Sequence, residues 1–142
     1  MAVLPSGLPE QVGDDEDLAR FLTSSGHYSD GGVRPNAFIP SPKGRSTSVS
    51  RHDRYPVDIL KKLGEVAVAA SGRRLHGAAI FKASAVRKAQ LAVDASEPPD
   101  RHALIHGWPW IEEDDPRARK AQQMTQAQQL VTAAGQPLLF DQ

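Results

Sequence analysis

The chain has 142 residues, a length that suits one domain with a core of its own. It contains no cysteine, which excludes disulfides, cysteine-ligated zinc, iron–sulfur clusters and thiol catalysis. Its formal net charge is zero, but residues 33–90 carry net +9 while residues 1–32 carry −5 and residues 91–142 carry −4. With no signal-peptide pattern and no apolar run of about 18 residues, a soluble cytoplasmic protein that avoids membranes is expected.

The start of the chain predicts a loose segment followed by a helix. Residues 1–13 contain two prolines and two glycines without lasting periodicity, so we expect a flexible leader ahead of a single domain over 14–142. Acidic residues then precede an apolar pattern at i, i+3 and i+4 that begins at Leu18. This pattern predicts a short helix over about 14–24.

Two short strands are expected next. Residues 37–39 form an apolar run closed by Pro40 and Pro42, which is typical of an edge strand. Residues 46–52 are polar and rich in hydroxyls, so we expect this second strand at a sheet edge or lining a site.

The clearest helix is predicted over residues 56–70. Pro56 can occupy the first helical position, and apolar residues then recur at spacings of three and four. They are Val57, Leu60, Leu63, Ala67 and Ala70. This stripe predicts the face that packs on the core.

The remainder alternates strands and helices and indicates the fold class. The candidate elements are strands at 78–81, 91–94 and 103–106 and helices at 83–89 and 114–134. Residues 75–89 are ambiguous, whereas Asp115 before Pro116 is a strong helix start. Together the elements predict an α+β domain with four or five short strands in a mixed or antiparallel sheet and about three longer helices.

A hydroxyl-rich basic stretch at residues 43–54 is the first candidate site. On a strand, Ser48 and Ser50 share one face, and hydroxyls beside arginine forks suit phosphate oxygens. The candidate anion-binding residues are Lys43, Arg45, Ser48, Ser50, Arg51, Arg54, Arg73 and Arg74. The competing interpretation is a solvated strand whose charge the acidic ends neutralise.

Histidines and arginines form a second candidate site. Imidazoles beside phosphate-holding arginines suit metal-independent acid–base chemistry. The candidate catalytic residues are Arg51, His52, Arg101, His102 and His106. On a strand His102 and His106 would lie about 13 Å apart, too far to share a metal, so neither a metal nor a cofactor is predicted. In the competing interpretation His102 caps a turn and His106 packs beside the tryptophans.

Two aromatic residues in one turn, Trp108 and Trp110, form the third feature. They would serve either as a stacking or partner-contact platform or as core packing at the end of the sheet.

Several elements resemble a family of small bacterial single-domain proteins with no established activity. They are Phe-Ile-Pro at 38–40, Ser-Val-Ser-Arg at 48–51 and the run from Pro99 to Pro109, followed by an alanine-rich helix. The resemblance implies a bacterial single-domain protein and no reaction.

Three functional hypotheses follow. The leading one is a binding or accessory module whose basic centre engages nucleic acid or an acidic partner protein. The second is a small toxin-like enzyme, an RNase or transferase, acting on a phosphate-containing substrate. The third is an antitoxin or immunity-type protein that uses an acidic end, residues 1–32 or 112–115. No P-loop, dinucleotide-binding or hydrolase motif selects a reaction, so whether the chain is an enzyme stays open.

Overall fold

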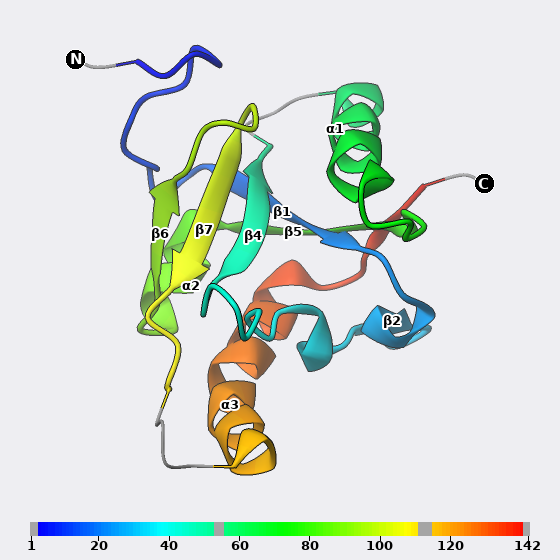
Figure 1. The fold of residues 1–142 in the computed structure, drawn as a ribbon, viewed down its shortest axis with the longest axis vertical. Coiled ribbons are helices and arrows are strands. Elements are labelled where there is room, and N and C mark those ends of the chain that lie inside the picture. The colour runs from blue at the N-terminus through cyan, green and yellow to red at the C-terminus, as the bar shows by residue number, and fades with distance from the viewer. Residues whose placement is uncertain (1–2, 53–55, 111–114, 141–142) are drawn as a thin grey trace.

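The computed structural model describes residues 3–52, 56–110 and 115–140. Six strands form one antiparallel sheet across the centre of the molecule (Figure 1). In spatial order they are β6 (Ala92–Ala95), β7 (His102–His106), β4 (Thr47–Arg51), β1 (Asp17–Leu22), β5 (Gly77–Lys82) and β8 (Leu138–Leu139). Two further strands, β2 (Tyr28–Ser29) and β3 (Gly32–Val33), pair with each other.

Helices cover both faces of the sheet (Figure 1). Helix α1 (Val57–Ala69) lies on one face, while α2 (Ala83–Lys88) and α3 (Pro116–Ala134) pack against the other. Two short 3-10 turns, η1 (Ser25–His27) and η2 (Pro35–Ala37), lie between β1 and β4. The architecture is α+β, as the sequence predicted, with six strands in the main sheet where four or five were expected.

Both long helices begin where their sequences predicted. The Asp115 side chain accepts a hydrogen bond from the Ala118 amide at 2.8 Å and Pro116 occupies the first turn of α3, so the predicted cap is confirmed. Helix α1 follows Pro56. The strand candidates at 78–81, 91–94 and 103–106 correspond to β5, β6 and β7.

The predicted helix over 14–24 is wrong, because these residues contain the strand β1. Strand β1 is a central strand with protein on both faces: Leu18 and Leu22 belong to the core beneath α2 and α3, and Ala19 to the core beneath α1. A strand buried on both faces carries apolar residues at adjacent positions, and this imitates helical spacing over a short window.

The strand expected at residues 37–39 is also absent. Ala37 ends the turn η2, and Phe38 follows it as a fully buried side chain whose ring meets that of Phe81 edge-to-face at 5.4 Å. The apolar run therefore fills the core from a turn, with Pro35 at its first position.

Strand β4 lies between β7 and β1, so its predicted edge position is wrong. A polar sequence is accommodated there because two of its buried side chains, Thr47 and Arg51, have partners inside the protein. The Thr47 hydroxyl donates to the Phe38 carbonyl at 2.7 Å, and the Arg51 guanidinium pairs with Glu16. The polar residues of β4 that face α1 remain available for a site.

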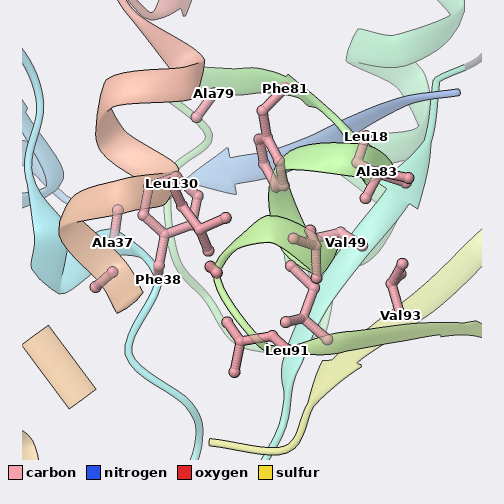
Figure 2. Close-up of a cluster of buried hydrophobic side chains, with 14 of the residues drawn as sticks. Leu18, Ala37, Phe38, Val49, Ala79, Phe81, Ala83, Leu91, Val93 and Leu130 are labelled. Atoms are coloured by element: carbon pink, nitrogen blue, oxygen red, sulfur yellow. The ribbon is translucent and has the colours of Figure 1, made fainter. Parts of the chain in front are cut away.

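Two cores hold the layers together. The larger one gathers side chains from the sheet, α2, α3 and η2, including Phe81, Val49 and Leu130 (Figure 2). The smaller one lies beneath α1 and contains Ala19, Leu60, Ala78 and Phe140. Helix α1 comes close to the sheet at Gly64, where a Cβ atom would lie 2.9 Å from the ring of Phe21.

Candidate functional site

Side chains of β4 alternate between the two faces of the sheet, which brings its hydroxyls toward α1. Val49 enters the larger core and Arg51 is buried on that same side, whereas Ser48 and Ser50 occupy the opposite face. The β4–β7 register pairs Ser50 with His102, so a hydroxyl and an imidazole become neighbours. Two residues far apart in the sequence are thus placed side by side by strand pairing.

A groove of about 570 Å³ opens between α1 and this face of the sheet. We call it the α1 groove. Its polar lining consists of Arg20, Thr23, Ser48, Ser50, Ser71, Arg73, Asp100 and His102. Its apolar lining includes Phe21, Leu63, Val66 and Ala67. The volume lies within the range of small-molecule sites.

Arg20 anchors the floor of the groove where β1 and β4 separate. Its Nε donates to the Ala37 carbonyl at 2.8 Å and its Nη1 to the Ser48 carbonyl at 2.9 Å. These bonds use two of the five N–H donors of a guanidinium. Burial, and then the like charge of Arg73, lower the pKa of Arg20 to about 10, so it remains a cation at neutral pH.

Ser50 contributes a buried hydroxyl to the same floor. The residue is 5% exposed, and its Oγ has no hydrogen-bond partner among the residues that the structure describes. A buried hydroxyl without a partner costs stability, roughly 1–3 kcal/mol. Ser50 is also among the residues that line the α1 groove.

His102 lies next to Ser50 with one ring nitrogen already engaged. Its Nδ1 is 3.0 Å from the Ser96 carbonyl oxygen. Because a carbonyl only accepts, Nδ1 carries the hydrogen, and Nε2 is left to accept when the ring is neutral or to donate when it is protonated.

A second group of basic side chains lies near Arg20. Burial lowers the pKa of His27, and the charges of Arg20, Arg73 and His76 lower it further. The Nδ1 of His27 accepts the Thr23 amide at 3.3 Å, consistent with a neutral ring. The positive charge at this end of the groove therefore comes from Arg20 and Arg73, which line it.

The groove gathers three of the eight residues predicted for the anion site. Ser48, Ser50 and Arg73 line it, together with His102 from the predicted catalytic set. Lys43, Arg45 and Arg74 are outside its lining, and Arg54 lies outside the described residues.

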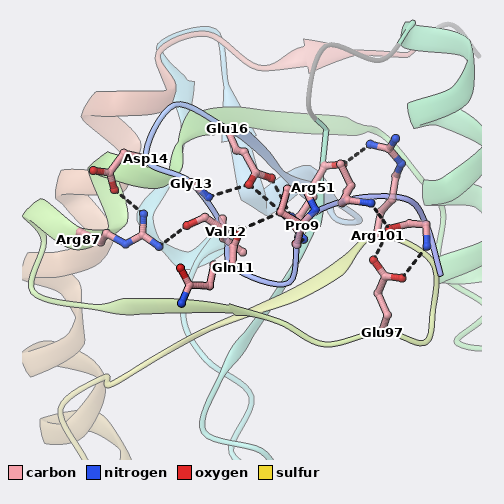
Figure 3. Close-up of polar contacts among 12 residues, drawn as sticks. Pro9, Gln11, Val12, Gly13, Asp14, Glu16, Arg51, Arg87, Glu97 and Arg101 are labelled. Atoms are coloured by element: carbon pink, nitrogen blue, oxygen red, sulfur yellow. Dashed lines mark hydrogen bonds and ion pairs between the residues drawn. The ribbon is translucent and has the colours of Figure 1, made fainter. Parts of the chain in front are cut away.

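Arg51 is buried away from the groove and fully engaged (Figure 3). Its Nε and Nη2 donate to the two carboxylate oxygens of Glu16 at 2.8 and 2.7 Å, and its Nη1 donates to the Pro9 carbonyl at 2.7 Å. Arg101 donates from Nη1 to the Arg51 carbonyl at 3.2 Å. Arg51 thus holds the N-terminal segment against the sheet, and neither arginine lines the α1 groove.

The other predicted catalytic residues are dispersed. His106 lies at the far end of β7, where its Nε2 is 2.5 Å from Asp94. His52 follows β4, and its amide donates to the Asp17 carbonyl at 2.8 Å. Of the five candidates, only His102 lines the α1 groove.

The two tryptophans occupy different surroundings. Trp108 is buried in the larger core. The ring of Trp110 has Arg45 over it at 4.9 Å and Arg119 at 4.4 Å from the ring centre. Both arginines stack on this ring, so it joins the loop before β4 to helix α3.

Sequence reasoning missed Arg20 and Thr23. Both were assigned to a helix and its end, where an arginine reads as an exposed residue. The available signal was a lone cation between Ala19 and Phe21, which in a strand with two covered faces must find partners inside the protein.

No family model, curated protein or solved structure matches this chain, so the bacterial resemblance brings no function to it. No helix among the described residues is long and apolar enough to cross a membrane. Within the same residues, no three His, Asp or Glu side chains are grouped so as to hold a metal ion. The cytoplasmic location and the absence of a cofactor stay predictions.

Proposed function

We propose that the protein is a binding module that takes an anionic ligand in the α1 groove. The observation that carries the proposal is the buried, unpartnered Ser50 hydroxyl on a floor that also holds Arg20. A protein keeps an unsatisfied buried donor at a cost in stability, and ligand binding is a common reason for doing so.

Charge supports the same proposal. Arg20 and Arg73 line one groove although they repel each other. Among the described residues that line the groove, Asp100 is the one carboxylate. An anion bound between the two arginines would relieve their repulsion and accept hydrogen bonds from donors that are already positioned.

A broad basic face for nucleic acid or an acidic protein has weaker support. In the part of the chain that the structure describes, three cations of the central region are paired with N-terminal carboxylates: Arg51 with Glu16, Lys82 with Asp17 and Arg87 with Asp14. Because these cations are already paired, a polyanion would have to bind mainly at the α1 groove, where it could place a single phosphate or carboxylate. The toxin-like enzyme and the antitoxin hypotheses stay predictions that no described contact favours over binding.

The test is a two-dimensional amide NMR titration of the intact protein with inorganic phosphate at low ionic strength. We expect saturable shifts at Ser48, Ser50 and His102 in the wild type. In Ser50→Ala the binding should weaken at least five-fold, while the free energy of unfolding should rise by about 1 kcal/mol because the orphan hydroxyl is gone.

Matched controls use neighbouring residues. Arg73→Gln should weaken binding, whereas Arg74→Gln, the adjacent exposed arginine outside the groove, should leave it unchanged. Shifts spread over the whole surface, or none at all, would exclude the groove as an anion site. Labelled RNA separates the polyanion case: binding that falls steeply with salt supports nucleic acid, and a flat response removes it.

A further inference from the structure

The apolar stripe of α1 is only partly covered by the rest of the chain. Leu60 and Gly64 are buried against the sheet, but Leu63 is half-buried and Ala67 is exposed. Val66 is 72% exposed, although it lines the same groove. An amphipathic helix normally buries an apolar face about 100° wide, so part of this face is left for something outside the fold.

The two sides of the groove differ in chemistry. One side is the α1 wall of Leu63, Val66 and Ala67, and the floor opposite carries Arg20 and Ser50. A bare inorganic anion would satisfy the floor and leave the wall in water. A purely apolar molecule would cover the wall, but it would leave the charge of the half-buried Arg20 without a counter-charge and the buried Ser50 hydroxyl without a partner.

We infer that the ligand is a small amphipathic anion, with a carboxylate or phosphate head at Arg20, Arg73 and Ser50 and an apolar body along α1. This deepens the proposed function and rests on it. The size of the groove, about 570 Å³, suits a small molecule. A long polyanion is charged along its whole length and has no regular match for the apolar wall.

The experiment compares four probes by isothermal titration calorimetry on the intact protein: decanoate, decyl phosphate, decanol and acetate. Each probe is kept below the concentration at which it forms micelles or aggregates. We expect decanoate or decyl phosphate to bind at least ten-fold more tightly than acetate, because the tail covers the wall. Either should also bind at least ten-fold more tightly than decanol, because the head meets the arginines. Whichever of decanoate and decyl phosphate binds more tightly shows whether the natural ligand carries a carboxylate or a phosphate.

Variants assign the two halves of the site. Val66→Ser, at a largely exposed position, should weaken decanoate at least three-fold and leave acetate unchanged. Arg73→Gln should weaken both, and Arg74→Gln neither. Arg20 is not used for this purpose, because it also holds the Ala37 and Ser48 carbonyls and its loss would disturb the fold.

Each outcome decides between the two proposals. If acetate and phosphate bind in the groove and a decyl tail adds nothing, the inference about the ligand fails and anion binding stands. If no anion binds, both fail. If decanol binds as tightly as decanoate, the proposed anionic head is wrong. If Val66→Ser and Arg73→Gln leave the affinity for decanoate unchanged, the proposed position of the ligand is wrong. Either result overturns the amphipathic ligand.

Discussion

At the scale of single residues, Arg51 shows how burial changes the role of a cation. Its side chain is fully buried and holds both oxygens of Glu16. Burial raises the pKa of Glu16, but the Arg51 hydrogen bonds, the Gly13 amide and the charges of Arg51 and Arg87 outweigh it, so the pKa is lowered overall. The Arg51–Glu16 pair therefore stabilises the fold. A ligand could bind Arg51 only by breaking this buried ion pair, which would cost several kcal/mol, about 3–5.

This pair predicts a pH-dependent stability. A carboxyl whose folded pKa is lowered contributes stability above its unfolded pKa, near 4.5, and that contribution is lost as pH falls through the folded value. Glu16→Gln should lower the free energy of unfolding by about 3 kcal/mol at pH 7, because a buried guanidinium loses its partner. When urea unfolding is measured as a function of pH, the difference in the free energy of unfolding between wild type and Glu16→Gln should become smaller below pH 4.

The control for this prediction is Glu10→Gln, an exposed carboxylate of the same segment. It should change stability by less than about 0.5 kcal/mol at either pH. A gap for Glu16→Gln that stays constant from pH 7 to pH 3 would contradict the assigned role of the ionised carboxylate.

At the scale of elements, the sheet ends in a strand that depends on one glycine. Strand β8 pairs with β5 through Gly77 opposite Leu139. A Cβ atom on Gly77 would lie 2.3 Å from the Leu138 carbonyl oxygen and 3.0 Å from the Leu139 Cα. Both are backbone atoms, so a side chain there forces β8 to move, and with it Phe140, which closes the core beneath α1.

Gly77→Ala is accordingly expected to lower the free energy of unfolding by about 2 kcal/mol and to speed exchange of the Phe140 amide. Chemical denaturation and amide hydrogen exchange measure the two effects. Gly31→Ala is the matched control, because a Cβ there would meet only the Ser29 Oγ, at an ordinary 3.7 Å. Unchanged stability with a protected Phe140 amide would show that β8 does not approach as closely as described.

At the scale of the whole molecule, the segregated charge of the sequence becomes pairing in space. Carboxylates near the N-terminus reach cations of the middle third, as Asp14 does with Arg87 and Glu16 with Arg51 (Figure 3). The N-terminal segment also makes contacts of its own. Leu8 is buried, and the Ser6 hydroxyl donates to Glu97 at 2.5 Å.

These contacts involve residues of the segment 1–13 that was expected to be a flexible leader. Its flexibility stays a prediction until its motion is measured. If the contacts hold in solution, deleting residues 1–10 removes the Pro9 carbonyl from Arg51 and the Leu8 side chain from the core. The free energy of unfolding should then fall by about 2–3 kcal/mol. Ser6→Ala removes the hydroxyl that donates to Glu97 and accepts from the Leu8 amide but keeps the backbone bond to Glu97, so it should cost less than about 1 kcal/mol. A deletion without effect on urea unfolding would support a leader that is loose.

The elements that local chemistry specifies were predictable. Helix α3 begins at the Asp115 cap and Pro116, and α1 follows Pro56, because caps and prolines act within a few residues. The β1 prediction failed because a strand covered on both faces has no period of two to detect. The central position of β4 was missed because two of its buried polar side chains find partners outside the strand: Thr47 donates to the Phe38 carbonyl, and Arg51 pairs with Glu16, 35 residues earlier in the chain.

By itself, the sequence determined the α+β class, most of the strands and helices, and the supply of hydroxyls and cations in the middle third. Tertiary structure alone decided which of those cations meet. Strand pairing placed Ser50 beside His102 and brought Arg20 to the same groove, while it buried Arg51 on the other face. The reason is physical: alternation along a strand fixes a side chain's face, but register and strand order, set by the packing of the whole core, fix its neighbours.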